Sequence, residues 1–179
     1  MILDFDRVPI LETERLRLEP LTQADAALLY PILGDAEIVA FWDTPDVDDP
    51  DMVGDLIRGQ IDAMNGGQAI HWVMRPLDGA PVVGGFELSQ IDRRHRRAEV
   101  GFVLARTASG LGYEAEVLPA VVAFAAASGL RKLAARTHLG DRSSETVLES
   151  MGFTEEGLLR GHILKDGERR DCRLFGLLL

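Results

Sequence analysis

The spacing of apolar positions along the chain predicts a mixed series of strands and helices. Residues 14–20 alternate charged and apolar side chains, which is typical of a half-buried strand. Apolar residues at helical spacing predict helices over residues 24–33, 51–64, 113–128 and 143–151. The order of the elements predicts one α/β domain spanning residues 1–179, with a mixed sheet and helices on both faces. Apolar runs bounded by turn residues predict the further strands, over residues 69–75, 81–91, 98–104, 132–139, 154–164 and 169–178.

Local signals at the ends of several elements support this division. Thr22 precedes the first helix and Asp25 follows three residues later, which is a capping box with aspartate in place of glutamate. Gly129 stands where the helix over residues 113–128 should stop. Residues 43–51 contain two prolines and five aspartates, so we expect a loop between two helices there.

Composition and charge narrow the class of protein. No apolar run approaches the roughly 20 residues that cross a bilayer, and the first residues are acidic, so we expect neither a membrane span nor a signal peptide. Cys172 is the single cysteine and allows no internal disulfide, which favours a cytoplasmic protein. The net charge of −10 argues against binding to nucleic acid or to anionic membranes. It fits a cationic partner such as an amine, although solubility alone also explains it.

A short glycine loop lies between a predicted strand and a predicted helix. Residues 109–113 read Ser-Gly-Leu-Gly-Tyr. Unpaired N–H groups and the helix dipole make a helix N-terminus favourable for an anion, and glycine lets the backbone approach it closely. An ordinary tight turn is the alternative. The spacing matches neither a Walker loop nor a dinucleotide-binding fingerprint.

Several segments in fixed order share their residues with one protein family. They are residues 13–18 with Asp25 and Ala26, 83–86, 98–104, 110–113 with Glu116, Ser144 with 147–149 and 151–153, and 156–160, followed by Gly167 and Asp171. These segments resemble the GNAT N-acetyltransferases, in the RimJ/RimL-type branch that includes ribosomal-protein-alanine acetyltransferases. The resemblance implies the GNAT fold, with a mostly antiparallel twisted sheet. It also implies acetyl-CoA as co-substrate, no metal, and transfer of an acetyl group by direct attack of a primary amine. The amine would belong to a protein N-terminus or to a small molecule.

The resemblance also implies which residues form the site. Glu99 matches a strand that borders the acceptor site and is our candidate general base, although an ion pair with Arg96 or Arg97 is the alternative. Ser144 is the candidate donor to the departing sulfur, with a structural role at the helix start as the alternative. The residues expected to bind acetyl-CoA are Phe102, Val103, Leu104, Ser109, Gly110, Leu111, Gly112, Tyr113, Asp141 and Ser144.

The glycine loop departs from the family pattern. Ser109, Leu111 and Glu114 stand where the family has glutamine or arginine, lysine, and a small residue. A Glu114 carboxylate about 5 Å from a pyrophosphate would weaken binding by roughly 3 kcal/mol at an effective dielectric of about 20. The same carboxylate is harmless if it points into solvent.

Two further departures lie near the next helix. Asp141 replaces an asparagine, so it can still cap that helix but lacks an amide donor for the pantetheine arm. Leu148 stands where many GNAT enzymes have a tyrosine acid. These changes leave an alternative function open, a GNAT-fold binding or scaffold protein whose coenzyme A loop has decayed.

Other chemically suggestive residues have structural interpretations. His71 and His138 lie in apolar strands, where a packed histidine is expected. The Arg-Arg-His-Arg-Arg run at residues 93–97 predicts a solvated loop, with contact to a cofactor phosphate or to RNA as the alternative. Phe41 and Trp42 could line the acceptor pocket or pack in the core. The apolar end at residues 177–179 predicts a homodimer surface or a buried last strand.

Overall fold

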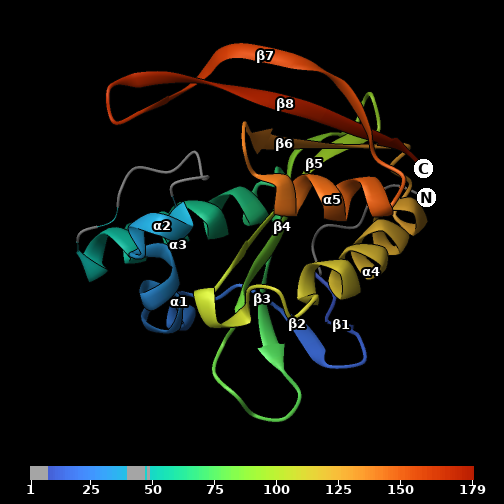
Figure 1. Cartoon of the computed structure of the whole chain (residues 1–179). Coiled ribbons are helices and arrows are strands. Elements are labelled where there is room, and N and C mark those ends of the chain that lie inside the picture. Colours follow the sequence, from blue (N-terminus) through green and yellow to red (C-terminus); the bar gives the residue numbers. More distant parts are fainter. Residues whose placement is uncertain (1–7, 40–46, 48) are drawn as a thin grey trace.

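One eight-stranded sheet organises the molecule, in the order β1-β2-β3-β4-β5-β6-β8-β7 (Figure 1). The computed structural model describes residues 8–39, 47 and 49–179. The strands are β1 Leu11–Glu12, β2 Leu16–Pro20, β3 Ile70–Pro76, β4 Gly84–Asp92, β5 Arg97–Leu104, β6 Lys132–His138, β7 Thr154–Lys165 and β8 Glu168–Leu178. The helices are α1 Ala26–Leu33, α2 Ala36–Val39, α3 Pro50–Asn65, α4 Tyr113–Ala127 and α5 Arg142–Ser150, with short 3-10 turns at Gln23–Asp25 and Arg106–Ala108.

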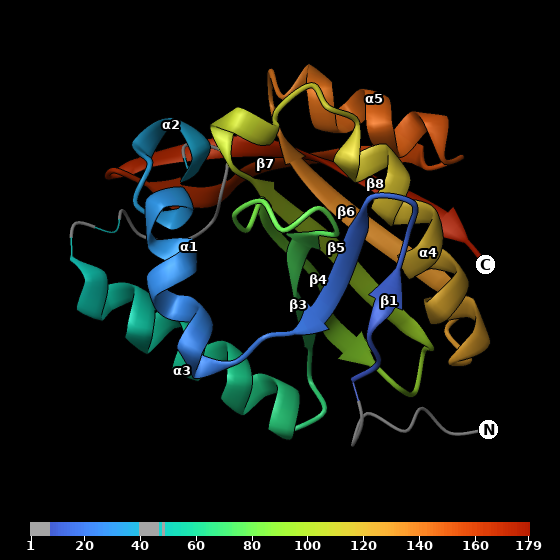
Figure 2. The same ribbon diagram turned by 90° about the horizontal axis from the view of Figure 1, so that it is seen from below.

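Helices cover both faces of the sheet, as the sequence predicts. α4 and α5 pack on one face, and α1 and α3 pack on the other (Figures 1 and 2). The larger core cluster lies under α4 and includes Trp72, whose ring meets Phe124 of α4 edge to face at 5.7 Å. The smaller cluster joins Leu29 of α1 and Ile57 of α3 to Val73 and Val103 of the sheet. Burial of these apolar side chains fixes the helices against the sheet.

All neighbouring strands are antiparallel except β5 and β6. This parallel pair is in register over three residues only, from Arg97 opposite Lys132 to Glu99 opposite Ala134. A parallel neighbour needs a crossover connection, and α4 provides it. The mixed, mostly antiparallel sheet is therefore confirmed.

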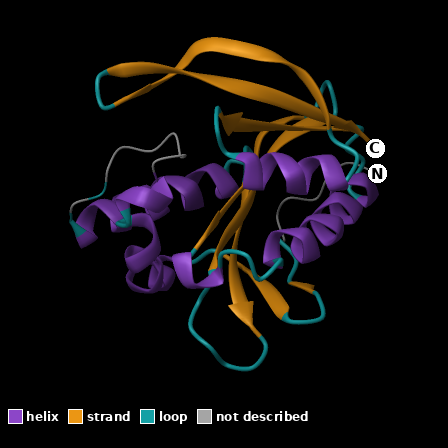
Figure 3. Ribbon diagram, viewed as in Figure 1, coloured by secondary structure: helices purple, strands orange, loops and turns teal. Residues whose placement is uncertain are grey.

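The C-terminal hairpin of β7 and β8 is the longest element, and Figure 3 shows its turn far from the C-terminal end. β8 inserts between β6 and β7, which places Leu177 against the main core and leaves Leu178 exposed. The last strand is thus an interior strand of the sheet. At the other end of the hairpin, the Lys165 ammonium donates to the carbonyl of Val39 in α2.

The ends of the predicted elements agree with the structure to within two residues, apart from four differences. The strand predicted over residues 14–20 is β2, and the short strand β1 before it was not predicted. Thr13 turns the chain between the two strands, and its amide donates to the Leu16 carbonyl (2.9 Å). The strand predicted over residues 81–91 begins at Gly84. The short helix α2 was not predicted, and the capping box of Thr22 and Asp25 encloses a 3-10 turn before α1.

The end of α4 and the charged turn before β5 follow the expectations from the sequence. Gly129 ends α4 with a φ of +93°, a backbone conformation that favours glycine. Residues 93–96 form an exposed turn, and Arg97 begins β5. Phe41 and Trp42 lie outside the described residues. Within the described part of the chain, no helix is both long and apolar enough to span a bilayer.

Candidate active site

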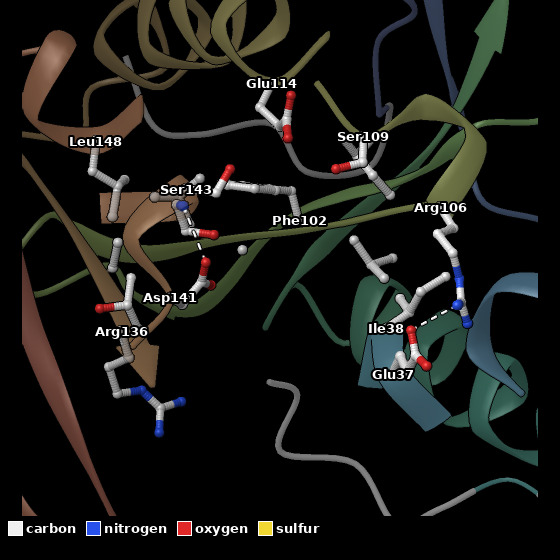
Figure 4. Close-up of a pocket in the computed structure, with 17 residues that line it drawn as sticks. Glu37, Ile38, Phe102, Arg106, Ser109, Glu114, Arg136, Asp141, Ser143 and Leu148 are labelled. Carbon is white, nitrogen blue, oxygen red and sulfur yellow. Dashed lines mark hydrogen bonds and ion pairs between the residues drawn. The ribbon is translucent and has the colours of Figure 1, made fainter. Parts of the chain in front are cut away.

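A cavity of about 330 Å³ opens where β5 and β6 separate. Val100–Leu104 of β5 and Ala135–Thr137 of β6 form its walls, immediately beyond the three paired residues (Figure 4). The Arg106–Ala108 turn, α5, the start of α4, and Glu37 and Ile38 of α2 contribute the rest. Most sheets have no such opening, because paired strands lie only about 4.8 Å apart.

Along β5, the N–H and C=O groups of successive residues point alternately toward β4 and toward β6. The amide of Lys132 donates to the carbonyl of Arg96 (3.3 Å) on the β6 side. On the β4 side, the amide of Ala105 donates to the carbonyl of Val83 (2.8 Å). Since successive residues of a strand direct their N–H and C=O groups to opposite edges, those of Phe102 and Leu104 are directed toward β6 and the cavity.

The cavity brings together part of the predicted site. Glu99, Gly110, Leu111, Gly112 and Tyr113 do not line it. The glycine loop instead lies beside the cavity, where Gly110 and Gly112 adopt φ values of +77° and +74°. The predicted residues that line the cavity are Phe102, Val103, Leu104, Ser109, Asp141 and Ser144.

The side chains of Thr13, Arg15 and Glu116 join the glycine loop and α4 to the edge of the sheet through hydrogen bonds and an ion pair. Glu116 of α4 accepts hydrogen bonds from the Thr13 hydroxyl (2.5 Å) and from Nε of Arg15 (2.6 Å). The Arg15 guanidinium also donates to the carbonyl of Leu111 (3.0 Å) and lies over the Tyr113 ring. Burial would raise the pKa of Glu116, but the hydrogen bonds from Thr13 and Arg15 outweigh it and lower that pKa.

Sequence reasoning assigned no role to this group. Thr13, Arg15 and Glu116 all fall in segments that match the family pattern. That shared pattern was the available signal, but the sequence gives no sign that residues about 100 positions apart pair with one another.

The arginine side chains around the cavity form ion pairs with carboxylates. Arg106 forms ion pairs with Asp35 (2.6 Å) and Glu37 (2.6 Å), and its hydrogen bond lowers the pKa of Asp35. Arg136 donates to Glu99 (2.6 Å), which is the ion pair that Glu99 forms in place of one with Arg96 or Arg97. The two arginines that line the cavity are therefore both matched by carboxylates.

Glu114 adds a carboxylate to the cavity wall. It is half-buried in the first turn of α4, and Figure 4 shows it projecting into the cavity near Ser109. The solvent-facing interpretation of Glu114 is therefore wrong. A negative charge here opposes the positive end of the α4 dipole, so the two act in opposite directions on any anion that approaches.

Asp141 caps α5, as the sequence predicts. Its carboxylate accepts a hydrogen bond from the backbone amide of Ser144 (3.2 Å). Ser144 and Leu148 of α5 line the cavity, so the side of the cavity that α5 forms carries a hydroxyl and an aliphatic side chain.

Thr137 of β6 supplies a polar atom that sequence reasoning missed. The residue is 4% exposed and is among those that line the cavity, and its buried hydroxyl has no hydrogen-bond partner among the described residues. Leaving a buried hydroxyl unpaired costs about 1–3 kcal/mol. A ligand in the cavity that pairs with this hydroxyl would recover that free energy.

A second and much smaller cavity, of about 30 Å³, lies on the face of the sheet that α1 and α3 cover. Leu21, Leu29 and Leu33 form its apolar side. Its polar side carries His71 of β3 and Glu87 of β4, with His71 Nδ1 3.1 Å from Glu87 Oε2. His71 is thus buried, as predicted, and it is paired with a carboxylate that the sequence did not single out.

Comparison with known proteins gives one consistent family. The sequence profile described as an acetyltransferase (GNAT) domain matches residues 15–154. An uncharacterized N-acetyltransferase, YoaA of Bacillus subtilis, is 25% identical over 95% of this chain and 97% of its own length. Among solved structures, the RimL ribosomal L7/L12 alpha-N-protein acetyltransferase has a TM-score of 0.87 at 19% identity, covering 96% of this chain and 95% of its own. Spermidine N-acetyltransferase from Vibrio cholerae, in complex with CoA and spermine, has a TM-score of 0.80 at 20% identity, covering 91% and 95%.

Proposed function

The chain belongs to the acetyltransferase (GNAT) family, and from that premise we propose that it transfers an acetyl group from acetyl-CoA to a primary amine. The observation that carries the proposal is the cavity between β5 and β6, whose wall is a strand edge. A related fold binds CoA and spermine, and another acetylates the N-terminus of a ribosomal protein. Both acceptors are amines, and the net charge of −10 suits a cationic acceptor.

The residues present fit the pantetheine arm of acetyl-CoA. That arm carries amide groups, which pair well with a strand edge such as Phe102–Leu104. The unpaired hydroxyl of Thr137 offers one more hydrogen bond to such a group. The first turn of α4 and the glycines before it would hold the pyrophosphate. Glu114 is the one residue of this set that fits poorly.

The chemistry divides between the substrate and the chain's own residues. Acetyl-CoA supplies a thioester whose C–S bond breaks as the amine nitrogen bonds to the carbonyl carbon, the electron pair leaving on sulfur. Backbone N–H groups of Phe102 and Leu104 would polarise a carbonyl placed against them. Ser144 would donate a hydrogen bond to the sulfur, which needs little help because a thiol has a pKa near ~8.5. A carboxylate on the acceptor side would take the proton of the amine.

A specific observation favours a second candidate, a GNAT-fold protein with impaired coenzyme A binding. Glu114 lies in the cavity wall, and both arginines of that wall are already paired with carboxylates. The cavity therefore offers little uncompensated positive charge for the phosphates of coenzyme A.

Calorimetric titration of acetyl-CoA at moderate salt separates the two candidates. The acetyltransferase should bind acetyl-CoA with a micromolar dissociation constant. It should also release thiol when spermidine or a peptide with a free N-terminal alanine or serine is added. Absence of binding at millimolar acetyl-CoA would exclude the transferase and favour the binding protein.

A further inference from the structure

The pair formed by Glu87 and His71 is built into the sheet. The two residues are directly opposite each other in the register of β3 and β4, so their side chains leave the same face as neighbours. His71 is 11% exposed and Glu87 is 26% exposed. The 3.1 Å contact between His71 Nδ1 and Glu87 Oε2 therefore holds a carboxylate at a fixed position in a largely apolar pocket.

The other carboxylate oxygen of Glu87, Oε1, lies close to Gly101 of β5. Glu87 is opposite Gly101 in the register of β4 and β5. A Cβ atom at residue 101 would lie 3.1 Å from Glu87 Oε1 and 3.2 Å from its Cγ, which is tighter than ordinary contact. The missing side chain of Gly101 thus makes room for the carboxylate. Oε2 faces His71 while Oε1 lies over the backbone of β5.

Three residues of β5 lie between the cavity that holds the carboxylate and the large cavity. Gly101, Phe102 and Val103 line both the 330 Å³ cavity and the 30 Å³ cavity. Gly101 is two residues beyond Glu99, the last residue of β5 that pairs with β6. A group bound in the small cavity would therefore approach the large cavity at the point where β5 becomes its wall.

The size of the small cavity indicates what it holds. A water molecule needs roughly 10–15 Å³ of such volume, so about 30 Å³ admits a water or an ammonium group but not a bulkier head. Its leucine side chains exclude further water, which strengthens the attraction between Glu87 and a cation.

Glu99, the carboxylate chosen from the sequence, is placed differently. It lies on the same face but forms a 2.6 Å ion pair with Arg136, and it lines neither cavity. The Glu99 carboxylate is therefore already bound by an arginine and lies outside the two cavities in which an acceptor could lie.

We propose that Glu87 is the catalytic carboxylate of the acceptor side, and that the small cavity selects a primary ammonium group. The proposal rests on the proposed acetyltransferase function. The ammonium binds to Glu87, transfers one proton to Oε1 and becomes the neutral amine that attacks, so Glu87 gains the proton that the amine loses. His71 is a positioning residue, because it acts by holding Oε2.

Binding of an ammonium probe tests the site without any turnover. The protein is labelled with ¹³C at glutamate carboxyls and titrated with propylammonium chloride or, as control, with tetramethylammonium chloride. We expect the Glu87 resonance, assigned by its loss in Glu87→Gln, to shift with propylammonium only. A response centred on Glu99, an equal response to both salts, or no response at Glu87 would overturn the proposal.

Kinetic variants test the proton transfer with the best amine substrate. Glu87→Gln should lower kcat at least about a hundredfold, with the dissociation constant of acetyl-CoA unchanged. Glu149→Gln, an exposed substitution on α5, is the matched control and should leave both values unchanged. A larger loss in Glu99→Gln than in Glu87→Gln would overturn the proposal. Failure of the wild-type chain to bind acetyl-CoA would instead contradict the acetyltransferase function and leave the ammonium titration to decide this site.

The positioning role of His71 has its own readout. Asparagine can present an N–H group near the place of Nδ1, whereas leucine cannot. We expect His71→Leu to lower kcat about tenfold or more, and His71→Asn to restore most of it, with the KM for acetyl-CoA constant in both. Equal losses in the two variants would reduce His71 to a packing role.

Discussion

Two helices begin at the edge of the same cavity, and their first turns are built in opposite ways. α5 is capped by its own Asp141, whose carboxylate accepts from the amide of Ser144. α4 begins at Gly112, a left-handed residue whose position provides no side-chain cap. The start of α5 has thus satisfied its own backbone, whereas the start of α4 remains available to an external anion. If the proposed function is correct, capping distinguishes the helix end that binds coenzyme A, at α4, from the one that supports the cavity, at α5.

The two glutamates in the first turn of α4 sharpen this comparison. Glu116 points away from the cavity and is held by Thr13 and Arg15. Glu114 lines the cavity, where an anion would bind. Glu116 thus stabilises the attachment of α4 to the sheet, whereas Glu114, two residues earlier, would repel an anionic ligand at the start of the same helix.

Neutralising Glu114 should have the largest effect. Glu114→Gln removes a repulsion of roughly 3 kcal/mol at about 5 Å and an effective dielectric of about 20. We expect acetyl-CoA to bind up to about a hundredfold more tightly, with a smaller gain at high salt. Calorimetry of the two proteins at two salt concentrations measures this. An unchanged dissociation constant would mean that the carboxylate turns away when the ligand binds.

Neutralising Glu116 should instead affect stability. Glu116→Gln weakens charge-assisted hydrogen bonds to Thr13 and Arg15, at a cost of about 2 kcal/mol, or roughly 6 °C in Tm. The folded pKa is lowered, so this contribution is complete above the unfolded pKa of about 4.3 and is lost as the pH falls through the folded value. The difference in Tm between the two proteins should therefore narrow in acid. A constant difference from pH 7 to pH 3 would contradict this account.

Changing the α5 cap should have an intermediate effect. Asp141→Ala removes the acceptor for the Ser144 amide and should cost about 1 kcal/mol of stability. Asp141→Asn keeps the cap and is the control for stability. If the start of α5 only supports the cavity, Asp141→Asn should change acetyl-CoA affinity less than threefold. A larger gain would show that an amide donor at residue 141 contacts the ligand directly.

The smallest effect is expected at Thr137 of β6. Thr137→Val removes a buried hydroxyl that has no partner among the described residues, so the unliganded protein should gain up to about 1 kcal/mol. The same change should weaken acetyl-CoA binding about fivefold, by losing one hydrogen bond. Thermal unfolding and calorimetry give the two values. A loss of stability without ligand would show that the hydroxyl already has a partner.

Sequence reasoning succeeded where the determinants are local. Asp141 caps α5 because cap and amide are three residues apart, and Gly129 ends α4 because one residue adopts a positive φ. The order of strands and helices followed from the same short-range periodicity, with β1 and α2 missed because they span two and four residues.

The parts of the site that were missed depend on distant residues. Arg15 meets Glu116 across 101 positions, and Glu99 meets Arg136 because the α4 crossover places β6 beside β5. The side of α4 on which Glu114 lies depends on how the helix is docked. No local pattern contains this information, so the choice of Glu99 as base could not be weighed against Glu87.

The short pairing of β5 with β6 also has a consequence for how the chain folds. Strands β1–β5 form one antiparallel unit, and β6, β8 and β7 form another. The sheet connects the two units through three residue pairs. We therefore expect native-state hydrogen exchange to resolve two cooperative units that open with different free energies. A ligand that spans the cavity would bind both units at once and bring their exchange rates closer together.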